Sequence, residues 1–171
     1  MSAGEPETHT FAGDGGIPNS RLPVLIYHEV EPARDPAQAE AMFAANDWRG
    51  AWRNGIFSFH HFHSTAHEVL AIVSGSARVS LGGPEGRGFD VARGDVLVLP
   101  AGTGHRNDGS SGDLMVVGAY PDGMDWDVRR GDPAQYAEAR ANIDAVPLPR
   151  TDPLFGSDGP LRRLWQPGEA D

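Results

Sequence analysis

The 171-residue sequence contains no lysine and no cysteine. Without lysine there is no side chain for a Schiff base, a pyridoxal anchor or the lysine of a P-loop. Without cysteine there is no thiolate nucleophile, disulfide, iron–sulfur cluster or cysteine-ligated zinc site. Any catalysis must therefore come from His, Asp, Glu, Ser, Thr or Tyr side chains, from a metal ion or from a bound cofactor.

Long apolar runs and a surplus of positive charge are also missing. No apolar run approaches the roughly 18 residues that a membrane-spanning helix needs. The first residues, MSAGEPETHT, lack the basic and apolar regions of a signal peptide. The formal net charge of −10 would be repelled by a phosphate backbone. We therefore expect a cytoplasmic protein that binds neither nucleic acid nor a membrane.

Glycine and proline are abundant, with 22 and 14 copies, and 39% of the residues are hydrophobic. This composition favours a turn-rich β fold over disorder, and the length predicts one domain. We expect residues 1–20 to form a flexible arm and residues 21–145 to form the domain. The Pro-rich residues 146–171 are expected to wrap around it as an extended tail.

Short apolar segments separated by turn residues occupy most of the chain. They predict strands over residues 23–30, 56–63, 67–74, 76–82, 88–92, 95–100 and 114–120. Asp35 and Asp132 each precede Pro-Ala-Gln, which is typical of a helix start, so helices are expected near 36–46 and 133–142. Trp48 and Trp52 then fall in a connector. Many short strands at this spacing predict a sandwich or a barrel-like jelly roll.

Histidines are concentrated in one short segment. His60, His61, His63 and His67 lie within eight residues, and Glu68 follows directly. His61 and His63 alternate along a predicted strand, so both should point to the same face. Two imidazoles on one face are a natural start for a metal site. His60 should point the other way and be structural or lie at an interface.

Two longer motifs include these residues. Residues 55–75 read G-x5-H-x-H-x4-E-x6-G, and residues 94–105 read G-x5-P-x-G-x2-H. They resemble the first and second signature motifs of the cupin superfamily. The asparagine that usually completes the second motif is replaced by Gly109, although Asn107 lies nearby.

A closer resemblance covers nearly the whole chain. The segments WRNGIFSFHHFHSTAHEVLAIVSG, GDVLVLPAGTGHRN, VGAYPDG and VPLPRTDPLFG are similar to a family of small bacterial cupins called YjlB-like, which has no established substrate or reaction. The resemblance implies an all-β double-stranded β-helix, the cupin or jelly-roll barrel, here with two short flanking helices. It also implies that the protein forms a homodimer.

The resemblance implies four metal ligands: His61, His63, Glu68 and His105. Three imidazoles and one carboxylate accept a divalent Fe, Mn, Ni, Cu or Zn ion. Four protein ligands on an octahedral ion would leave two positions for water, substrate or dioxygen.

One ligand position is contested, because the motif tolerates three or four residues before its Glu. His67 therefore competes with Glu68. Strand alternation favours Glu68, since that residue would share a face with Leu70 and Ile72. His67 would then orient a ligand or contact substrate.

Three further residues are candidates for contact with a substrate. Arg53 could bind an anionic group, or it could form a salt bridge that holds the first helix against the barrel. Tyr27 and Tyr120 are further candidates for the cavity lining. We expect His28 to be a hydrogen-bonded core residue.

The sequence supports two functions. The first is a metal-dependent enzyme that acts on an unidentified small molecule, with oxidation by dioxygen or isomerisation as its chemistry. The alternative is a non-catalytic cupin that binds or senses a small molecule. The motifs identify metal ligands but no catalytic residue.

Overall fold

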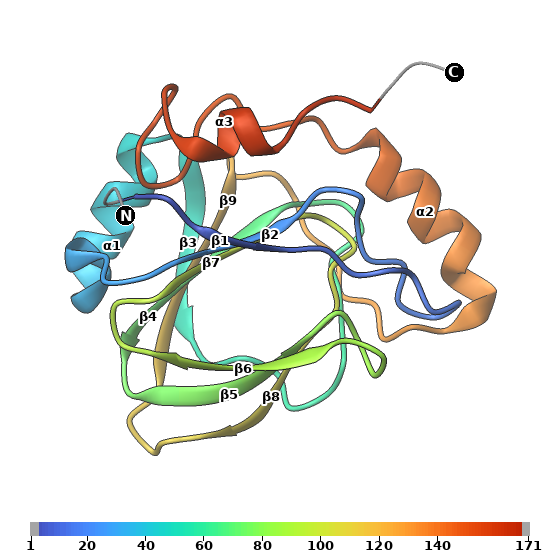
Figure 1. The fold of residues 1–171 in the computed structure, drawn as a ribbon, viewed down its shortest axis with the longest axis horizontal. Helices are drawn as coiled ribbons and strands as arrows, with labels where there is room; N and C mark the ends of the chain where they lie inside the picture. The colour runs from blue at the N-terminus through green and yellow to red at the C-terminus, as the bar shows by residue number, and fades with distance from the viewer. Residues whose placement is uncertain (1–3, 169–171) are drawn as a thin grey trace.

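The computed structural model describes residues 4–168 of the chain. Within these residues the strands form two antiparallel sheets that face each other (Figure 1). The larger sheet has the strand order β1-β2-β7-β4-β9-β3, and the smaller has the order β6-β5-β8. The strands are β1 (Glu7–His9), β2 (Val24–Tyr27), β3 (Trp48–Asn54), β4 (Glu68–Ser74), β5 (Ser76–Leu81), β6 (Arg87–Ala92), β7 (Val96–Leu99), β8 (His105–Ser110) and β9 (Met115–Pro121).

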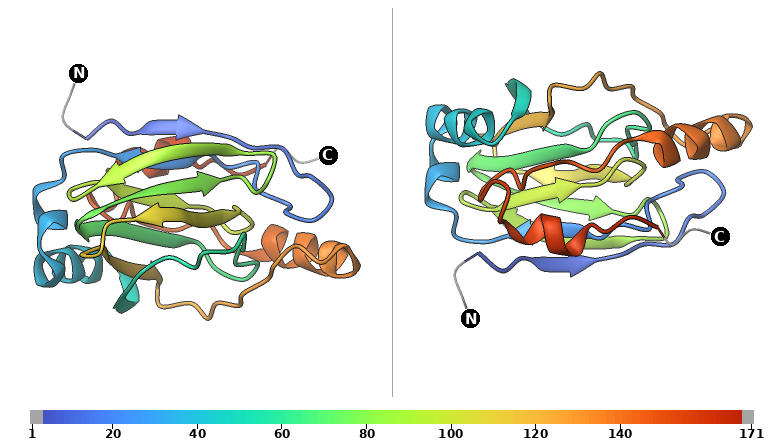
Figure 2. Two further views of the ribbon diagram at one scale, coloured as in Figure 1. Left: turned by 90° about the horizontal axis from the view of Figure 1, so that it is seen from below. Right: turned by 90° about the horizontal axis from the view of Figure 1, so that it is seen from above.

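Short helices lie outside this sandwich. They are η1 (Glu31–Arg34), α1 (Pro36–Ala45), η2 (Pro133–Gln135), α2 (Tyr136–Ala145) and α3 (Pro160–Leu164). Seen from above, the C-terminal segment with α3 lies across the six-stranded sheet (Figure 2, right). No helix in the described part of the chain is long and apolar enough to cross a membrane.

The six-stranded sheet is buried on both faces, as β4 shows. Leu70 and Ile72 point between the two sheets and belong to the same apolar cluster as Val79 of β5. Val69 and Ala71 point outward and belong to a second cluster. That cluster also holds apolar residues of α1, α3 and the chain around α3: Ala39, Phe43, Leu161 and Trp165. The predicted alternation along this strand is therefore confirmed, and the face of Leu70 is the interior of the sandwich.

Several predicted elements are confirmed. The first helix begins at Pro36, and the Asp35 carboxylate accepts a hydrogen bond from the Gln38 N–H at 2.9 Å. The strands predicted over 67–74, 76–82, 88–92, 95–100 and 114–120 appear as β4, β5, β6, β7 and β9.

The structure differs from the sequence prediction at both ends of the chain. Residues 7–9 of the expected flexible arm form β1, which pairs with β2. His28 is not a core residue: its side chain is 46% exposed and hydrogen-bonds to Glu7 and Asp95. The tail expected to be extended contains α3. The terminal residues 1–3 and 169–171 of the arm and tail lie outside the described residues.

The middle of the chain also differs. The connector expected to hold Trp48 and Trp52 is strand β3, which pairs with β9. The segment 56–63, expected to be a strand, makes only isolated bridges, between His61 and His105 and between Phe62 and Arg129. His61 and His63, the histidines of this segment that were predicted to be metal ligands, therefore lie on irregular backbone.

Candidate metal centre

Three histidine side chains from two distant segments meet inside the sandwich. His61, His63 and His105 are buried, and each offers a ring nitrogen within 4.8 Å of the other two. His105 begins β8, and its backbone exchanges two hydrogen bonds with His61, at 2.9 and 3.2 Å. This short bridge joins the first and second sequence motifs.

The other ring nitrogen of each histidine is held by a backbone carbonyl. Nδ1 lies 2.9 Å from the Phe59 oxygen in His61 and 3.0 Å from the Thr103 oxygen in His105. In His63 it lies 2.5 Å from the Asp127 oxygen. A carbonyl can only accept a hydrogen bond, so each Nδ1 carries the proton. Nε2 is therefore the nitrogen of each ring that is left to bind a metal when the imidazole is neutral, which is the usual arrangement of a metal-binding histidine.

Glu68 completes the cluster as the first residue of β4. Its Oε1 lies 3.3 Å from Nε2 of His63 and 3.4 Å from Nε2 of His105, and the side chain is 4% exposed. A buried carboxylate is costly unless it is paired or coordinates a metal. Burial alone would raise the pKa of Glu68, but the hydrogen bonds of His105 and His63 outweigh burial and lower it. The side chain is thus an anion.

The histidines differ in how their surroundings shift their pKa values. Burial, reinforced by His105, lowers the pKa of His61 to about 3, so this ring is neutral at physiological pH. Burial also opposes charge on His63, but the Glu68 carboxylate outweighs burial and raises its pKa. The buried residues together offer three imidazole nitrogens and one carboxylate, a donor set that suits a divalent transition metal.

A glycine turn brings His105 into this cluster. The chain leaves β7 through Pro100, and Gly102 has a φ of +96°. A Cβ at Gly102 would lie 2.5 Å from the backbone oxygen of Asn19, so only glycine fits without a shift of the backbone. The Gly102 N–H also donates to the backbone oxygen of His63 at 2.8 Å. The second motif is thereby tied to the first.

The cluster opens into a cavity of about 480 Å³, which is within the usual size of small-molecule sites. Tyr120 and Arg53 both line it, as expected for substrate-contacting candidates. The Tyr120 hydroxyl accepts a hydrogen bond from Trp52 Nε1 at 2.8 Å. Burial, with the charge of Glu68, raises the pKa of Tyr120. This hydroxyl therefore keeps its proton and can donate it in a hydrogen bond.

Arg53 forms the salt bridge that was the alternative to anion binding. Its Nη2 and Nε lie 2.7 and 3.1 Å from the two carboxylate oxygens of Glu40 in α1. Two parallel bonds of this kind fix both position and orientation. Arg53 thus holds α1 against β3 at the rim of the cavity.

The structure does not bring Tyr27 and His67 to the cavity. The Tyr27 hydroxyl donates to the buried Asp152 carboxylate on the outer side of the six-stranded sheet. His67 Nδ1 accepts from the Ala101 N–H at 2.9 Å, and its Nε2 lies 3.1 Å from the Pro147 oxygen. Both ring nitrogens of His67 are therefore engaged away from the metal centre. Alternation along a strand cannot reveal which face of a doubly buried sheet borders a cavity.

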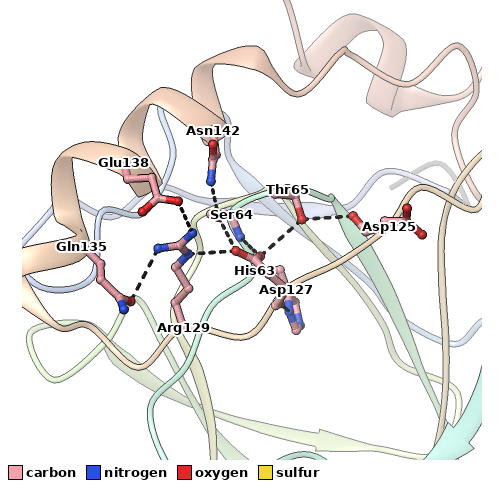
Figure 3. Close-up of polar contacts among 9 residues, drawn as sticks. All are labelled: His63, Ser64, Thr65, Asp125, Asp127, Arg129, Gln135, Glu138 and Asn142. Carbon is pink, nitrogen blue, oxygen red and sulfur yellow. Dashed lines mark hydrogen bonds and ion pairs between the residues drawn. The ribbon is translucent and has the colours of Figure 1, made fainter.

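A loop that the sequence analysis did not identify supports His63 (Figure 3). The Asp127 carbonyl accepts from His63, and its carboxylate accepts from both the N–H and the hydroxyl of Ser64, at 2.6 and 2.5 Å. Arg129 donates to the same carboxylate and, through Nη2, to Glu138 of α2. No sequence motif identifies this loop. Asp127 contacts His63 through its backbone carbonyl and Ser64 through its carboxylate, and neither group has a recognisable spacing in the sequence.

Comparison with known proteins agrees with the fold and the two motifs. The chain belongs to the cupin family, whose profile matches residues 36–122. It is 36% identical over 162 residues to the uncharacterised protein YjlB of Bacillus subtilis, covering 94% of this chain and 97% of that protein.

Several solved structures resemble the chain more distantly. An acireductone dioxygenase from Bacillus anthracis, with cadmium in its active centre, is 20% identical, with 49% of this chain and 56% of that chain covered and a TM-score of 0.35. A mutant oxalate decarboxylase from Bacillus subtilis is 20% identical, with 75% and 34% covered and a TM-score of 0.40. A double-stranded β-helix protein from Klebsiella pneumoniae is 15% identical, with 76% and 84% covered and a TM-score of 0.36. These scores are too low to transfer any property of those proteins to this chain.

Proposed function

We propose that the chain binds one divalent metal ion through Nε2 of His61, His63 and His105 and the carboxylate of Glu68. We further propose that it is an enzyme acting on a small molecule in the adjoining cavity, by oxidation with dioxygen or by isomerisation. The observation that carries the proposal is the shared hydrogen bonding of the three histidines. Their Nδ1 atoms are bound to carbonyls, so the Nε2 atoms of three clustered rings are the nitrogens left to bind a metal.

The donor set accepts Fe, Mn, Ni, Cu or Zn. When bound, such an ion would act as a Lewis acid that polarises an oxygen of the substrate. The protein itself supplies a buried anion at Glu68, which offsets part of the charge of the ion. It also supplies the protonated Tyr120 hydroxyl, which lines the cavity. Because Trp52 donates to this hydroxyl, the Tyr120 proton is left to donate either to the Glu68 carboxylate or to a substrate oxygen.

The metal proposal is tested by elemental analysis of purified protein, before and after addition of Fe(II), Mn(II), Ni(II), Cu(II) or Zn(II). We expect about one metal per chain in wild-type protein and little in a His61→Ala variant. The matched control is His60→Ala, because His60 is the chain neighbour of His61 and does not line the cavity. Wild-type protein that holds less than about a tenth of a metal per chain, and gains none on addition, would contradict the proposal.

The enzymatic part is tested separately on the metal form that occurs in the producing cell. A small-molecule library is incubated with that form, and both dioxygen uptake and product masses are followed. We expect at least one compound to be converted by the wild type but not by His61→Ala. A compound that binds the metal-loaded protein and is never consumed would instead favour a binding or sensing function.

A further inference from the structure

Two large aromatic side chains line the cavity while remaining half exposed. Phe57 is 50% exposed and Trp126 is 48% exposed, and both border the same cavity as the histidines. Aromatic rings bury much apolar area on folding and on binding, so such exposure beside a cavity marks a surface available to a ligand.

Each of these rings stands edge-on to one of the proposed metal ligands. Phe57 meets His61 at a centroid distance of 5.1 Å and an interplanar angle of 77°. Trp126 meets His63 at 5.6 Å and 75°. A ligand that reaches the histidine cluster therefore passes within contact of both aromatic rings.

Both rings are also stacked on a neighbouring aromatic ring. Phe57 lies nearly parallel to Phe59, at 4.9 Å and 14°, and Trp126 lies nearly parallel to Tyr120, at 5.9 Å and 17°. One face of each ring is thus turned to its stacked partner, while about half of each side chain stays exposed. Flat apolar surfaces of this kind favour a flat ligand.

The chain neighbours of Trp126, Asp125 and Asp127, are held by hydrogen bonds to Thr65 and Ser64 (Figure 3). The Asp125 carbonyl accepts from the Thr65 hydroxyl at 3.0 Å, and the Asp127 carboxylate accepts from Ser64. Both anchors lie directly after His63 in the chain. The backbone on each side of Trp126 is therefore fixed before a ligand arrives, which reduces the entropic cost of binding.

The described side chains that line the cavity include no cation that is free of a carboxylate partner. Among the described residues that line it, Arg53 is the only cation, and both of its bonds go to Glu40. The polar groups near the metal centre are the Glu68 carboxylate and the Tyr120 hydroxyl. A carboxylate or phosphate that does not itself bind the proposed metal would find no unpaired cationic side chain among the described lining residues.

We propose that the substrate carries a planar, conjugated ring, with no charged group apart from the atoms that bind the metal, and that this ring packs against Phe57 and Trp126. One or two oxygen atoms on or beside the ring then point to the centre formed by His61, His63 and His105 with Glu68. This inference rests on the proposed metal-dependent function and specifies the class of compound that the site takes. Phe57 and Trp126 are the residues that select the ring.

The test uses three probes that share one metal-chelating group: benzohydroxamate, cyclohexanecarbohydroxamate and acetohydroxamate. Only the first has a planar ring, and the second matches its size. Calorimetric titration of Zn(II)-loaded protein should show benzohydroxamate binding about tenfold more tightly than the cyclohexane probe, as two aromatic contacts allow. Acetohydroxamate should bind most weakly. Equal affinities for the benzene and cyclohexane probes would overturn the inference.

The variants Trp126→Leu and Phe57→Leu should each reduce this preference to about threefold or less, with unchanged zinc content. Phe155→Leu is the matched control, because Phe155 is equally exposed, at 50%, but does not line the cavity. It should keep the full preference. A preference that survives in both cavity variants would overturn the assignment of Phe57 and Trp126.

Zinc content measured on the same samples separates this inference from the proposed function. Zinc bound without a ring preference contradicts only the inference. If zinc does not bind, the titrations are repeated with Fe(II), Mn(II), Ni(II) and Cu(II). If none of these ions binds, the metal proposal fails, and benzamide is then compared with cyclohexanecarboxamide on the metal-free protein. Tighter binding of benzamide would support the ring preference, and equal binding would overturn it as well.

Discussion

His67 and Glu68 are neighbours in the chain, but their side chains lie on opposite faces of the six-stranded sheet. Glu68 Oε1 lies 3.3 Å from Nε2 of His63 in the interior of the sandwich. The His67 ring lies 4.9 Å from the Trp165 ring on the outer face. Successive residues of a strand point to opposite sides, so only one of these two can reach the metal centre.

This arrangement predicts that His67 contributes to stability and not to metal binding. His67→Leu leaves the buried Ala101 N–H without its acceptor and removes the partly buried contact to the Pro147 oxygen. We expect the free energy of unfolding to fall by about 1–3 kcal/mol, measured by urea denaturation. Metal content should equal that of the wild type. A folded His67→Leu protein that no longer binds metal would contradict the placement of His67.

The buried Asp152 predicts a large loss of stability at the C-terminal segment. Its carboxylate accepts from the Tyr27 hydroxyl, the N–H groups of residues 154–155 and the Leu161 N–H. Asp152→Asn places an amide donor among these donors, so we expect a loss of about 3 kcal/mol in denaturant unfolding. The exposed Asp158→Asn should change stability by less than about 0.5 kcal/mol. Similar values for the two variants would refute this role.

The loop beside the metal centre predicts an indirect effect on metal affinity. The Asp127 carboxylate accepts hydrogen bonds from Ser64 and Arg129. These bonds fix the position of the Asp127 carbonyl, which in turn orients the His63 ring. We expect Asp127→Asn to weaken zinc binding roughly 10–100-fold, because loss of a group that hydrogen-bonds a ligating histidine has this effect at other metal sites. The zinc affinity is measured by competition with a chromophoric chelator. Asp125→Asn is the control, because Asp125 contributes a backbone carbonyl to Thr65. An Asp127→Asn affinity within twofold of the control would contradict the coupling.

The contact between β1 and β2 predicts a pH-dependent stability. His28 Nε2 lies 2.5 Å from Glu7 and its Nδ1 lies 2.9 Å from Asp95. Burial alone would lower the pKa of His28, but its hydrogen bonds to Asp95 and Glu7 outweigh burial and raise the pKa. A raised pKa means that the folded state binds the proton more tightly than the unfolded state. The contribution of His28 is therefore complete below the unfolded-state pKa of about 6.5 and is lost as pH rises through the folded-state pKa.

The corresponding experiment compares wild-type protein with His28→Gln. The wild type should be more stable at pH 5.5, by less than about 1 kcal/mol because the pair is partly exposed. The difference should shrink by pH 8.5. An NMR titration of the His28 ring should give a pKa above its usual value, and a lowered value would contradict the account.

Much of the buried cluster of three histidines and Glu68 could be predicted from the sequence, because the spacing of the two motifs constrains which side chains meet. The pattern of β4 correctly placed Glu68 with Leu70 and Ile72, since strand alternation follows from backbone geometry. The glycine and proline spacing of the second motif correctly indicated a turn that brings His105 inward.

Other parts could not be predicted, for identifiable physical reasons. Strand β8, with the sequence HRNDGS, is largely polar and exposed, so it shows no apolar alternation. Strand β3 is an edge strand with an exposed face, so its sequence also lacks the alternation of apolar and polar residues that would predict a strand. The segment 56–63 alternates like a strand but bridges to two separate segments, at His105 and Arg129. Such pairing depends on distant parts of the chain.

The central claim is that three histidines and Glu68 hold one metal ion, and anomalous X-ray diffraction from crystals soaked in Zn(II) tests it most directly. The account predicts one strong peak inside the sandwich. It should lie about 2.0–2.2 Å from Nε2 of His61, His63 and His105 and from a carboxylate oxygen of Glu68. A fully occupied zinc peak on other residues, or no peak between these four ordered side chains, would contradict it.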